Sequence, residues 1–239
     1  MAEKKKRARP LKTLLKILLY LLLALLTAAA VLLIIPLTEK PDTTSVEGSD
    51  SWMAALPDDA MLNEIILPGT HDSGSKYVQL GFVTKCQSLT IGEQLDAGYR
   101  YLDIRLCVDG DRMKLTHSFT NCKTKALGND VLYLDTVLEQ CYAFLRAHPS
   151  ETVVFAVKQE YGDDSVADFE ALLNSYVEKN PEYWLNSDTL PTVGEARGKL
   201  VLMRRYDDAA NIGAASGIPL LWVNQDGFDD VSKNTEEND

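Results

Sequence analysis

An uncharged apolar run near the N-terminus limits most strongly what this chain can fold into. Residues Ile17–Ile35 read ILLYLLLALLTAAAVLLII, a run of 19 residues whose only polar side chains are Tyr20 and Thr27. At about 1.5 Å per helical residue, the run matches the hydrocarbon thickness of a bilayer. No face of such a helix is polar enough to meet water, which argues against a buried helix in a globular core. We therefore expect a transmembrane helix over residues 17–36.

The charges before this run set its expected orientation. Residues 1–16 carry seven Lys or Arg side chains and one acid, Glu3. Basic flanks stay on the cytoplasmic side, so we expect a basic cytoplasmic tail, an uncleaved signal anchor at the cell membrane, and an exported remainder. A cleaved signal peptide is the alternative, with a cleavage site at Ala28–Ala30, but the apolar run continues to Pro36 and favours the anchor.

The exported part is strongly acidic. The chain has 239 residues and a formal net charge of −11, and the residues after the tail carry 17 basic and 34 acidic side chains. Such a body repels nucleic acids, so any phosphate group that it binds must be held by local cations in a defined pocket. Residues 37–50 are polar and indicate a linker, and residues 51–239 are enough for one domain with a single core.

Four cysteines lie in this exported part, at Cys86, Cys107, Cys122 and Cys141. Their spacing contains no CxxC pair, which argues against a zinc site. Outside the cytosol they can pair in three ways, or they can remain small buried thiols.

Apolar runs of strand length alternate with helical patterns in the domain. This alternation predicts an α/β fold with a mostly parallel sheet. The expected strands cover Glu64–Leu67, Tyr99–Val108, Lys114–His117, Thr152–Lys158, Lys199–Arg205 and Pro219–Asn224. The expected helices cover Ser88–Ala97, Leu134–Ala147 and Asp164–Glu178.

Charged or imidazole side chains recur where these runs end. They are His71, Asp103, Arg105, His117, Lys158, Arg205 and Asp226. Along several runs one face is apolar until its last residue, as in a TIM-type barrel with a packed interior and a reactive rim. No Gly-rich phosphate loop follows the first run, as an open doubly wound sheet would favour. We therefore expect a TIM-type barrel.

Two imidazoles and one guanidinium define the expected site. His71 and His117 can serve as general base and general acid near neutral pH, and Arg105 can donate to phosphoryl oxygens. This set suits cleavage of a phosphodiester by an internal hydroxyl group. No metal or other cofactor is expected, because the arginine neutralises the developing charge.

Several motifs resemble one known family. They are LPGTHDSGS (Leu67–Ser75), QSLTIGEQLDAGYRYLDIRL (Gln87–Leu106), LTHS (Leu115–Ser118), ETVVFAVKQEY (Glu151–Tyr161), RGKLVLMRRY (Arg197–Tyr206) and NQDGF (Asn224–Phe228). Together they resemble the catalytic X-domain of bacterial phosphatidylinositol-specific phospholipase C over roughly residues 52–228. The first two motifs are highly specific in combination, whereas the last is weak.

The resemblance implies a role for each central residue. His71 would deprotonate the inositol 2-hydroxyl, and His117, with Asp72 as its carboxylate partner, would protonate the diacylglycerol oxygen. Arg105 would contact the phosphate where calcium sits in eukaryotic relatives, and Asp103 would help to position it. The implied products are diacylglycerol and inositol 1,2-cyclic phosphate, and the cis 2-hydroxyl makes the attack intramolecular.

The resemblance also implies an inositol-binding set, which comprises Lys158, Arg205, Asp226 and Phe228. Phe228 stands where the family usually has a tyrosine that stacks on the ring. The expected lipid is phosphatidylinositol or a glycosyl-phosphatidylinositol. The expected partners are this lipid and, through the N-terminal helix, the membrane, with no nucleic acid.

The C-terminus departs from the family. Six candidate strands are present where a closed barrel needs about eight, so we expect the barrel to be incomplete at its C-terminus, in a fragment or a shortened protein. The missing part would supply the aspartate that orients His71. Two other functions stay open: a catalytically silent phosphoinositol-binding surface protein on the same fold, and a metal-dependent glycerophosphodiester phosphodiesterase.

Overall fold

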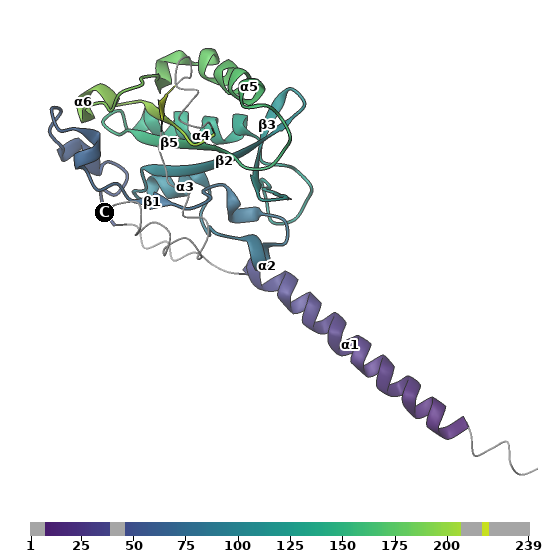
Figure 1. Cartoon of the computed structure of the whole chain (residues 1–239). Helices are drawn as coiled ribbons and strands as arrows, with labels where there is room; N and C mark the ends of the chain where they lie inside the picture. The colour runs from purple at the N-terminus through teal and green to yellow at the C-terminus, as the bar shows by residue number, and fades with distance from the viewer. Residues whose placement is uncertain (1–7, 39–45, 207–216, 220–239) are drawn as a thin grey trace, which may run out of the picture.

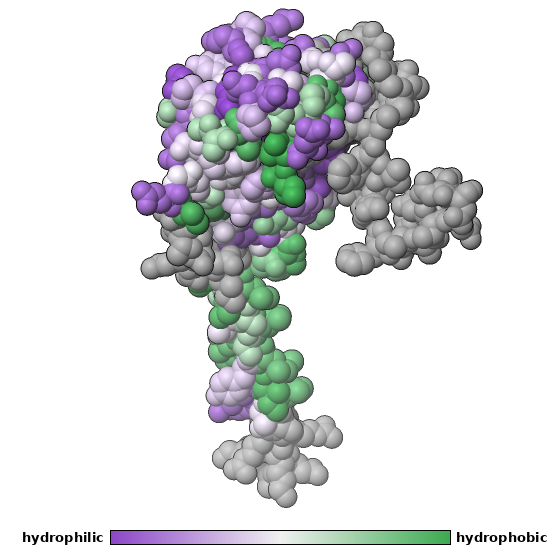
Figure 2. All heavy atoms as spheres, turned by 90° about the vertical axis from the view of Figure 1, so that its left-hand side faces the viewer, coloured by the Kyte–Doolittle hydropathy of each residue, from purple (hydrophilic) through white to green (hydrophobic). Residues whose placement is uncertain are grey.

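The N-terminal apolar run forms one long helix. The computed structural model describes residues 8–38, 46–206 and 217–219. Helix α1 (Ala8–Thr38) contains a 24-residue apolar stretch, Leu11–Ile34, whose side chains are not buried within the molecule. Figure 1 shows α1 extending away from the α/β body, and Figure 2 shows its apolar surface below a mixed polar body. Signal sequences and membrane anchors share these features, so the helix indicates a secretory route and does not distinguish between them.

The body is built on a mixed eight-stranded sheet. Its central strands, β2 (Tyr101–Asp109), β5 (Val153–Gln159) and β7 (Leu200–Arg204), are parallel neighbours. The short strands β1 (Gly69–Thr70), β6 (Trp184–Leu185) and β8 (Ile218–Pro219) pair in parallel with β2 or β7. Strands β3 (Arg112–His117) and β4 (Thr120–Asn121) add an antiparallel hairpin beside β2.

Short and long helices connect these strands. The α-helices after α1 are α2 (Gly81–Thr84), α3 (Ile91–Asp96), α4 (Leu134–Ala147), α5 (Val166–Lys179) and α6 (Val193–Ala196). Four 3-10 turns cover Trp52–Ala55, Leu62–Glu64, Ser75–Tyr77 and Pro181–Tyr183. Helix α3 begins at a capping box in which Thr90 and Glu93 satisfy each other's backbone N–H groups. The prediction for α4 is confirmed residue for residue, and α3 is shorter than expected at both ends.

Alternation along the strands separates two apolar clusters. Leu102, Ile104 and Leu106 of β2 point to the side packed against α3, α4 and α5. The opposite side contributes Val154 and Val201 to a second, smaller cluster. Asp103 and Arg105 share this second face, because successive strand side chains point to opposite sides. The sequence pattern therefore placed the polar residues on the correct face.

Two expectations about the strands are wrong. Glu64–Leu67 is not a strand: Glu64 ends a 3-10 turn, its carboxylate accepts from the Met61 amide at 3.2 Å, and Ile66 is 95% exposed. The first strand is instead β1, directly before His71. His117 also does not end a parallel strand, because β3 is the returning arm of a hairpin with β2. Within the described ranges, no pairing joins β1 to β6 or β8, so the sheet is open there.

A buried ion pair fixes the amino end of β2. The side chains of Arg100 and Glu151 are both 0% exposed, and Arg100 donates to Glu151 Oε2 from Nε at 2.9 Å and from Nη2 at 2.8 Å. Arg100 also donates to backbone oxygens, including that of Asp50 at 2.9 Å, and it lies over the ring of Phe144. The pair thereby attaches the first residues of the domain to the sheet.

Candidate active site

The strand register gathers cations at the carboxyl edge of the sheet. Arg105 on β2 lies opposite Lys158 on β5. Arg205 follows β7 directly, and its amide donates to the Val157 carbonyl at 2.7 Å. These three side chains therefore come from neighbouring strands at nearly the same height, where ligands of parallel sheets bind.

Asp103 is the anionic centre of this edge. Its buried carboxylate accepts from Arg205 Nη1 at 2.7 Å through Oδ1. Its Oδ2 accepts from Arg105 Nε at 3.1 Å and from the Asp72 amide at 3.0 Å. One carboxylate thus holds two guanidinium groups and the loop that follows β1.

The loop after β1 presents His71 beside this centre. Thr70 donates to Gln94 Oε1 at 2.7 Å, and the Ser73 amide donates to the Asp103 carbonyl at 2.9 Å, which ties the loop to α3 and β2. The His71 side chain is 62% exposed, and its Nδ1 lies 3.3 Å from both Arg105 Nη2 and Asp103 Oδ2. Arg105 Nη2 can therefore donate to Nδ1 when Nδ1 is unprotonated, and Asp103 Oδ2 can accept from Nδ1 when it carries a proton.

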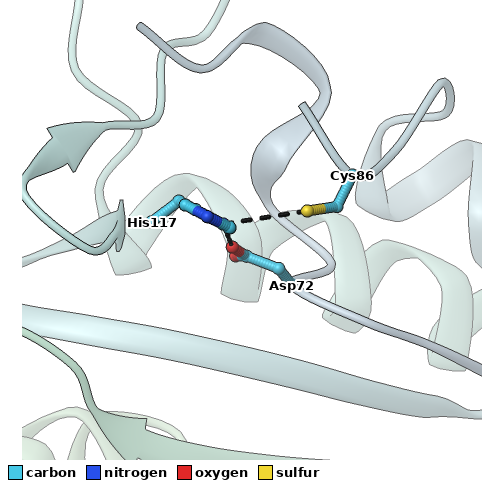
Figure 3. A group of neighbouring side chains, drawn as sticks. All are labelled: Asp72, Cys86 and His117. Atoms are coloured by element: carbon cyan, nitrogen blue, oxygen red, sulfur yellow. Dashed lines mark hydrogen bonds and ion pairs between the residues drawn. The ribbon is translucent and has the colours of Figure 1, made fainter. Parts of the chain in front are cut away.

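The β3–β4 hairpin brings the second imidazole to the same loop. His117 ends β3, and its Nδ1 makes a hydrogen bond with Asp72 Oδ2 (Figure 3). Asp72 is 2% exposed, and burial raises its pKa although the hydrogen bond to His117 works in the opposite direction. The backbone φ of Asp72 is 48°, a left-handed conformation that an aspartate tolerates better than most residues. In this left-handed backbone conformation, the Asp72 carboxylate is within hydrogen-bond distance of the His117 imidazole.

Glu160 joins the site and was missed in the sequence. Its Oε1 accepts from Arg105 Nη1 at 3.1 Å and from the Ser118 amide at 3.3 Å, and its Oε2 forms an ion pair with Lys158 Nζ at 3.0 Å. Burial acts to raise its pKa, but the hydrogen bond from Lys158 and the charge of Arg105 outweigh burial and hold the pKa below its usual value. Its position two residues after Lys158, on the same side of an extending strand, was the available signal.

The structure brings most of the expected residues to one edge. They are His71, Asp72, Asp103, Arg105, His117, Lys158 and Arg205. Asp226 and Phe228 lie outside the described residues. The arrangement offers two imidazoles, each beside an acid, together with fixed cations, which is a set able to bind a phosphodiester and transfer protons at its oxygens.

Cys86 is a second residue that sequence reasoning missed here. Its Sγ lies 3.7 Å from His117 Nδ1, and ligand atoms of Asp72, Cys86 and His117 all lie within 4.8 Å of one another. All four cysteines are free thiols, and Cys107, Cys122 and Cys141 are buried. The sequence argument against a zinc site considered only spacings between cysteines, so it could not detect one cysteine beside an aspartate and a histidine.

Comparisons with known proteins match this region. The model of the family "Phosphatidylinositol-specific phospholipase C, X domain" matches residues 68–206. A 1-phosphatidylinositol phosphodiesterase from Staphylococcus aureus strain Newman is 33% identical over 165 residues, which cover 65% of this chain and 51% of that protein. A protein of the same name from Listeria monocytogenes is 30% identical over 179 residues, which cover 69% of this chain and 51% of that protein. The chain therefore spans about half the length of these relatives.

Solved structures agree. A double mutant of the phosphatidylinositol-specific phospholipase C from S. aureus aligns with a TM-score of 0.62 and 27% identity, over 74% of this chain and 60% of that one. The phosphatidylinositol-specific phospholipase C from L. monocytogenes aligns with a TM-score of 0.57 and 25% identity, over 74% of this chain and 64% of that one. The family model covers more than half of the sequence and contains the residues gathered at the carboxyl edge. This chain belongs to the phosphatidylinositol-specific phospholipase C X-domain family.

Proposed function

We propose that this chain carries the catalytic part of an exported phosphodiesterase that cleaves phosphatidylinositol-type lipids. The single observation that carries the proposal is a pair of acid–imidazole contacts, Asp103 with His71 and Asp72 with His117, the first of which lies against Arg105. The products are diacylglycerol and inositol 1,2-cyclic phosphate. The sheet of the described residues is, on this proposal, part of a TIM-type barrel.

His71 acts as the general base. It removes the proton of the inositol 2-hydroxyl, and that oxygen attacks phosphorus. Arg105 donates to the non-bridging oxygens, where negative charge develops, and its own charge is secured by Asp103 and Glu160, which raise its pKa against the effect of burial. The Asp103 carboxylate, 3.3 Å from His71 Nδ1, stabilises the positive charge that forms on the imidazole.

His117 acts as the general acid for the diacylglycerol oxygen. Its Nδ1 is bound to Asp72, so its Nε2 is the atom that can hold and release the proton. The buried carboxylate stabilises the imidazolium form until the leaving oxygen takes that proton. The base follows β1 and the acid ends β3, so the two imidazoles come from different elements and can take different parts in the reaction.

Charged groups on the neighbouring strands bind the inositol ring. Lys158, Glu160 and Arg205 form this set, joined by Asp226 and Phe228 from the part outside the described residues. Hydroxyl groups of the ring both donate and accept, which suits a rim of alternating cations and carboxylates. Phosphatidylinositol and glycosyl-phosphatidylinositol share this head group and are both candidate substrates.

The surface beside α1 supports action at a membrane. A cavity of about 230 Å³ lies between the end of α1 and the α2 region, lined by Leu32, Leu33 and Phe82 among others. Val83 on α2 is 69% exposed, and Lys76, Lys85 and Lys123 line the same cavity. Exposed apolar side chains flanked by lysines are typical of protein surfaces that insert into the head-group layer of a membrane. We propose that α1 is an uncleaved anchor and that the site faces the outer leaflet.

The test is cleavage of phosphatidylinositol by the full chain in mixed micelles, followed by phosphorus NMR. We expect cyclic inositol phosphate from the wild type, with and without EDTA. His117→Asn should lower the rate by at least about 100-fold, because general acid catalysis typically contributes that much. His148→Asn, which changes a histidine at the end of α4 and away from the site, is the matched control.

Three outcomes would reject parts of the proposal. Normal release of cyclic product by His117→Asn would remove the general acid. Loss of activity in EDTA would favour the metal-dependent glycerophosphodiester reaction. Binding of phosphatidylinositol with no turnover in the wild type would favour the silent binding protein.

A further inference from the structure

Cys86 extends the proposed general-acid pair into a cluster of three different ligand types. Its sulfur lies 3.7 Å from His117 Nδ1, the same atom that is bound to Asp72 (Figure 3). An imidazole nitrogen, a thiol sulfur and a carboxylate oxygen lie within 4.8 Å of one another. Among the residues that the structure describes, this is the one group of three such side chains close enough to share an ion.

The position of Cys86 is fixed by the same loop that positions Asp72. The Cys86 amide donates to Ser75 Oγ at 3.1 Å, and Ser75 Oγ donates to the Asp72 carbonyl at 2.7 Å. The Cys86 thiol also contacts the Thr84 carbonyl at 3.6 Å. Asp72 and Cys86 are therefore held together through the Ser75 hydroxyl, by contacts that do not depend on an ion.

The surroundings of Cys86 do not suit a nucleophile. Burial and the nearby charge of Asp72 raise the pKa of the thiol, so the reactive thiolate is disfavoured. A divalent metal reverses this preference, because a coordinated thiol loses its proton. Mixed nitrogen, sulfur and oxygen ligands match the borderline-soft character of zinc, and sites with three protein ligands leave a fourth position open.

We propose that Asp72, Cys86 and His117 form a zinc-binding site that inhibits the enzyme. Zinc bonds to Cys86 Sγ, His117 Nδ1 and an Asp72 oxygen, and the protons of the thiol and of Nδ1 pass to solvent with no transfer of electrons. The short contact between His117 and Asp72 opens to admit the ion. Because the ion replaces the hydrogen bond that orients His117, the imidazole can no longer act with its carboxylate.

The proposal makes zinc an inhibitor and not a cofactor. The proposed chemistry proceeds through Arg105 without a metal, so removing zinc restores activity and does not abolish it. Only the inhibition rests on the proposed function, since the ion can bind whether or not the chain is an enzyme.

The first experiment measures metal binding alone. The full chain in detergent micelles is titrated with Zn²⁺ by calorimetry and with Co²⁺ by absorption, where a thiolate–cobalt charge-transfer band reports the sulfur ligand. We expect one such site in the wild type and at least about tenfold weaker binding in Cys86→Ala, since even outer-shell changes at metal sites cost 10- to 100-fold. Cys107→Ser is the matched control, because Cys107 bonds only to its neighbouring backbone at Val108 in the described contacts.

The results divide cleanly. Loss of the charge-transfer band in Cys86→Ala and its retention in Cys107→Ser would support the site. Equal affinity of the wild type and Cys86→Ala, or no charge-transfer band in the wild type, would overturn it. If the metal bound instead to carboxylates on the acidic surface, neither Cys86→Ala nor Cys107→Ser would change its affinity, and this result would count against the proposal.

The second experiment measures inhibition. If the wild type cleaves phosphatidylinositol, Zn²⁺ should inhibit it reversibly. Measured against its own metal-free rate, Cys86→Ala should need at least about tenfold more Zn²⁺ for half-inhibition. Equal inhibition of both proteins would overturn the inhibitory role. An inactive wild type that still binds Co²⁺ through Cys86 would instead reject the proposed function and leave the metal site standing.

Discussion

The buried Arg100–Glu151 pair allows a sharp prediction about stability. Replacing Glu151 with Gln keeps the shape and one acceptor oxygen but removes the negative charge from a pair whose side chains are both 0% exposed. Arg100 then keeps a charge that burial already disfavours, since burial lowers its pKa against the effect of Glu151. Breaking such a pair from one side typically costs about 3–5 kcal/mol, because the remaining charge stays buried. For a domain of this size, that loss lowers the melting temperature by about 6–20 °C.

The measurement is urea unfolding of the full chain in detergent micelles. The indole N–H of Trp52 donates to the Gly98 carbonyl at 3.0 Å and its ring lies near Arg100, so its fluorescence reports the region directly. The control is Asp135→Asn, which breaks the exposed Arg112–Asp135 pair and should leave the midpoint unchanged within error. An equally small effect of Glu151→Gln would refute the claim that the buried charge needs its partner.

Three further predictions concern the site. The pKa of Glu160 is below its usual value, so its ionised form stabilises the fold above the usual pKa, and this stabilisation is lost as the pH falls through the lowered pKa. In urea titrations at acid pH, the difference in unfolding free energy between the wild type and Glu160→Gln should therefore shrink. A difference that stays constant with pH would contradict the lowered pKa of Glu160. Val83→Ser on α2 should slow cleavage of lipid in vesicles severalfold and leave a short-chain monomeric substrate unaffected, whereas equal losses on both would point to damage at the site itself. Asp103→Asn should lower kcat in steady-state assays by at least about tenfold, because it removes the carboxylate charge that lies beside His71 and pairs with the arginines. An unchanged kcat would exclude a role of Asp103 in positioning these groups.

The sequence predicts the face of each central strand and the helix α4 well. Both depend on periodicity, which local physics controls: Asp103 and Arg105 alternate with buried Leu102 and Ile104. The carboxyl-edge residues could be predicted for the same reason, since parallel strands with a common polarity end at one edge.

Other features depend on contacts that a single segment does not contain. Glu64–Leu67 is apolar enough for a strand, but β2 pairs with Gly69–Thr70 instead, after Pro68 accepts two backbone hydrogen bonds from Arg100 and Tyr101. The direction of β3 follows from the tight turn after Asp109, which turns a predicted parallel strand into a hairpin. Cys86 lies beside His117 only because the loop and the hairpin meet in three dimensions.

Asp103 gives the site a property that single substitutions will hide. Its two oxygens connect Arg205, Arg105 and the backbone of Asp72, three parts of the chain that are far apart in sequence. Groups that share one partner do not lose their contributions independently. Double-mutant cycles across Arg105 and Arg205 should therefore show strong coupling, and the second substitution should cost much less than the first. The loop after β1, Arg105 and Arg205 would then be stabilised cooperatively through Asp103, and losing one contact would weaken the others.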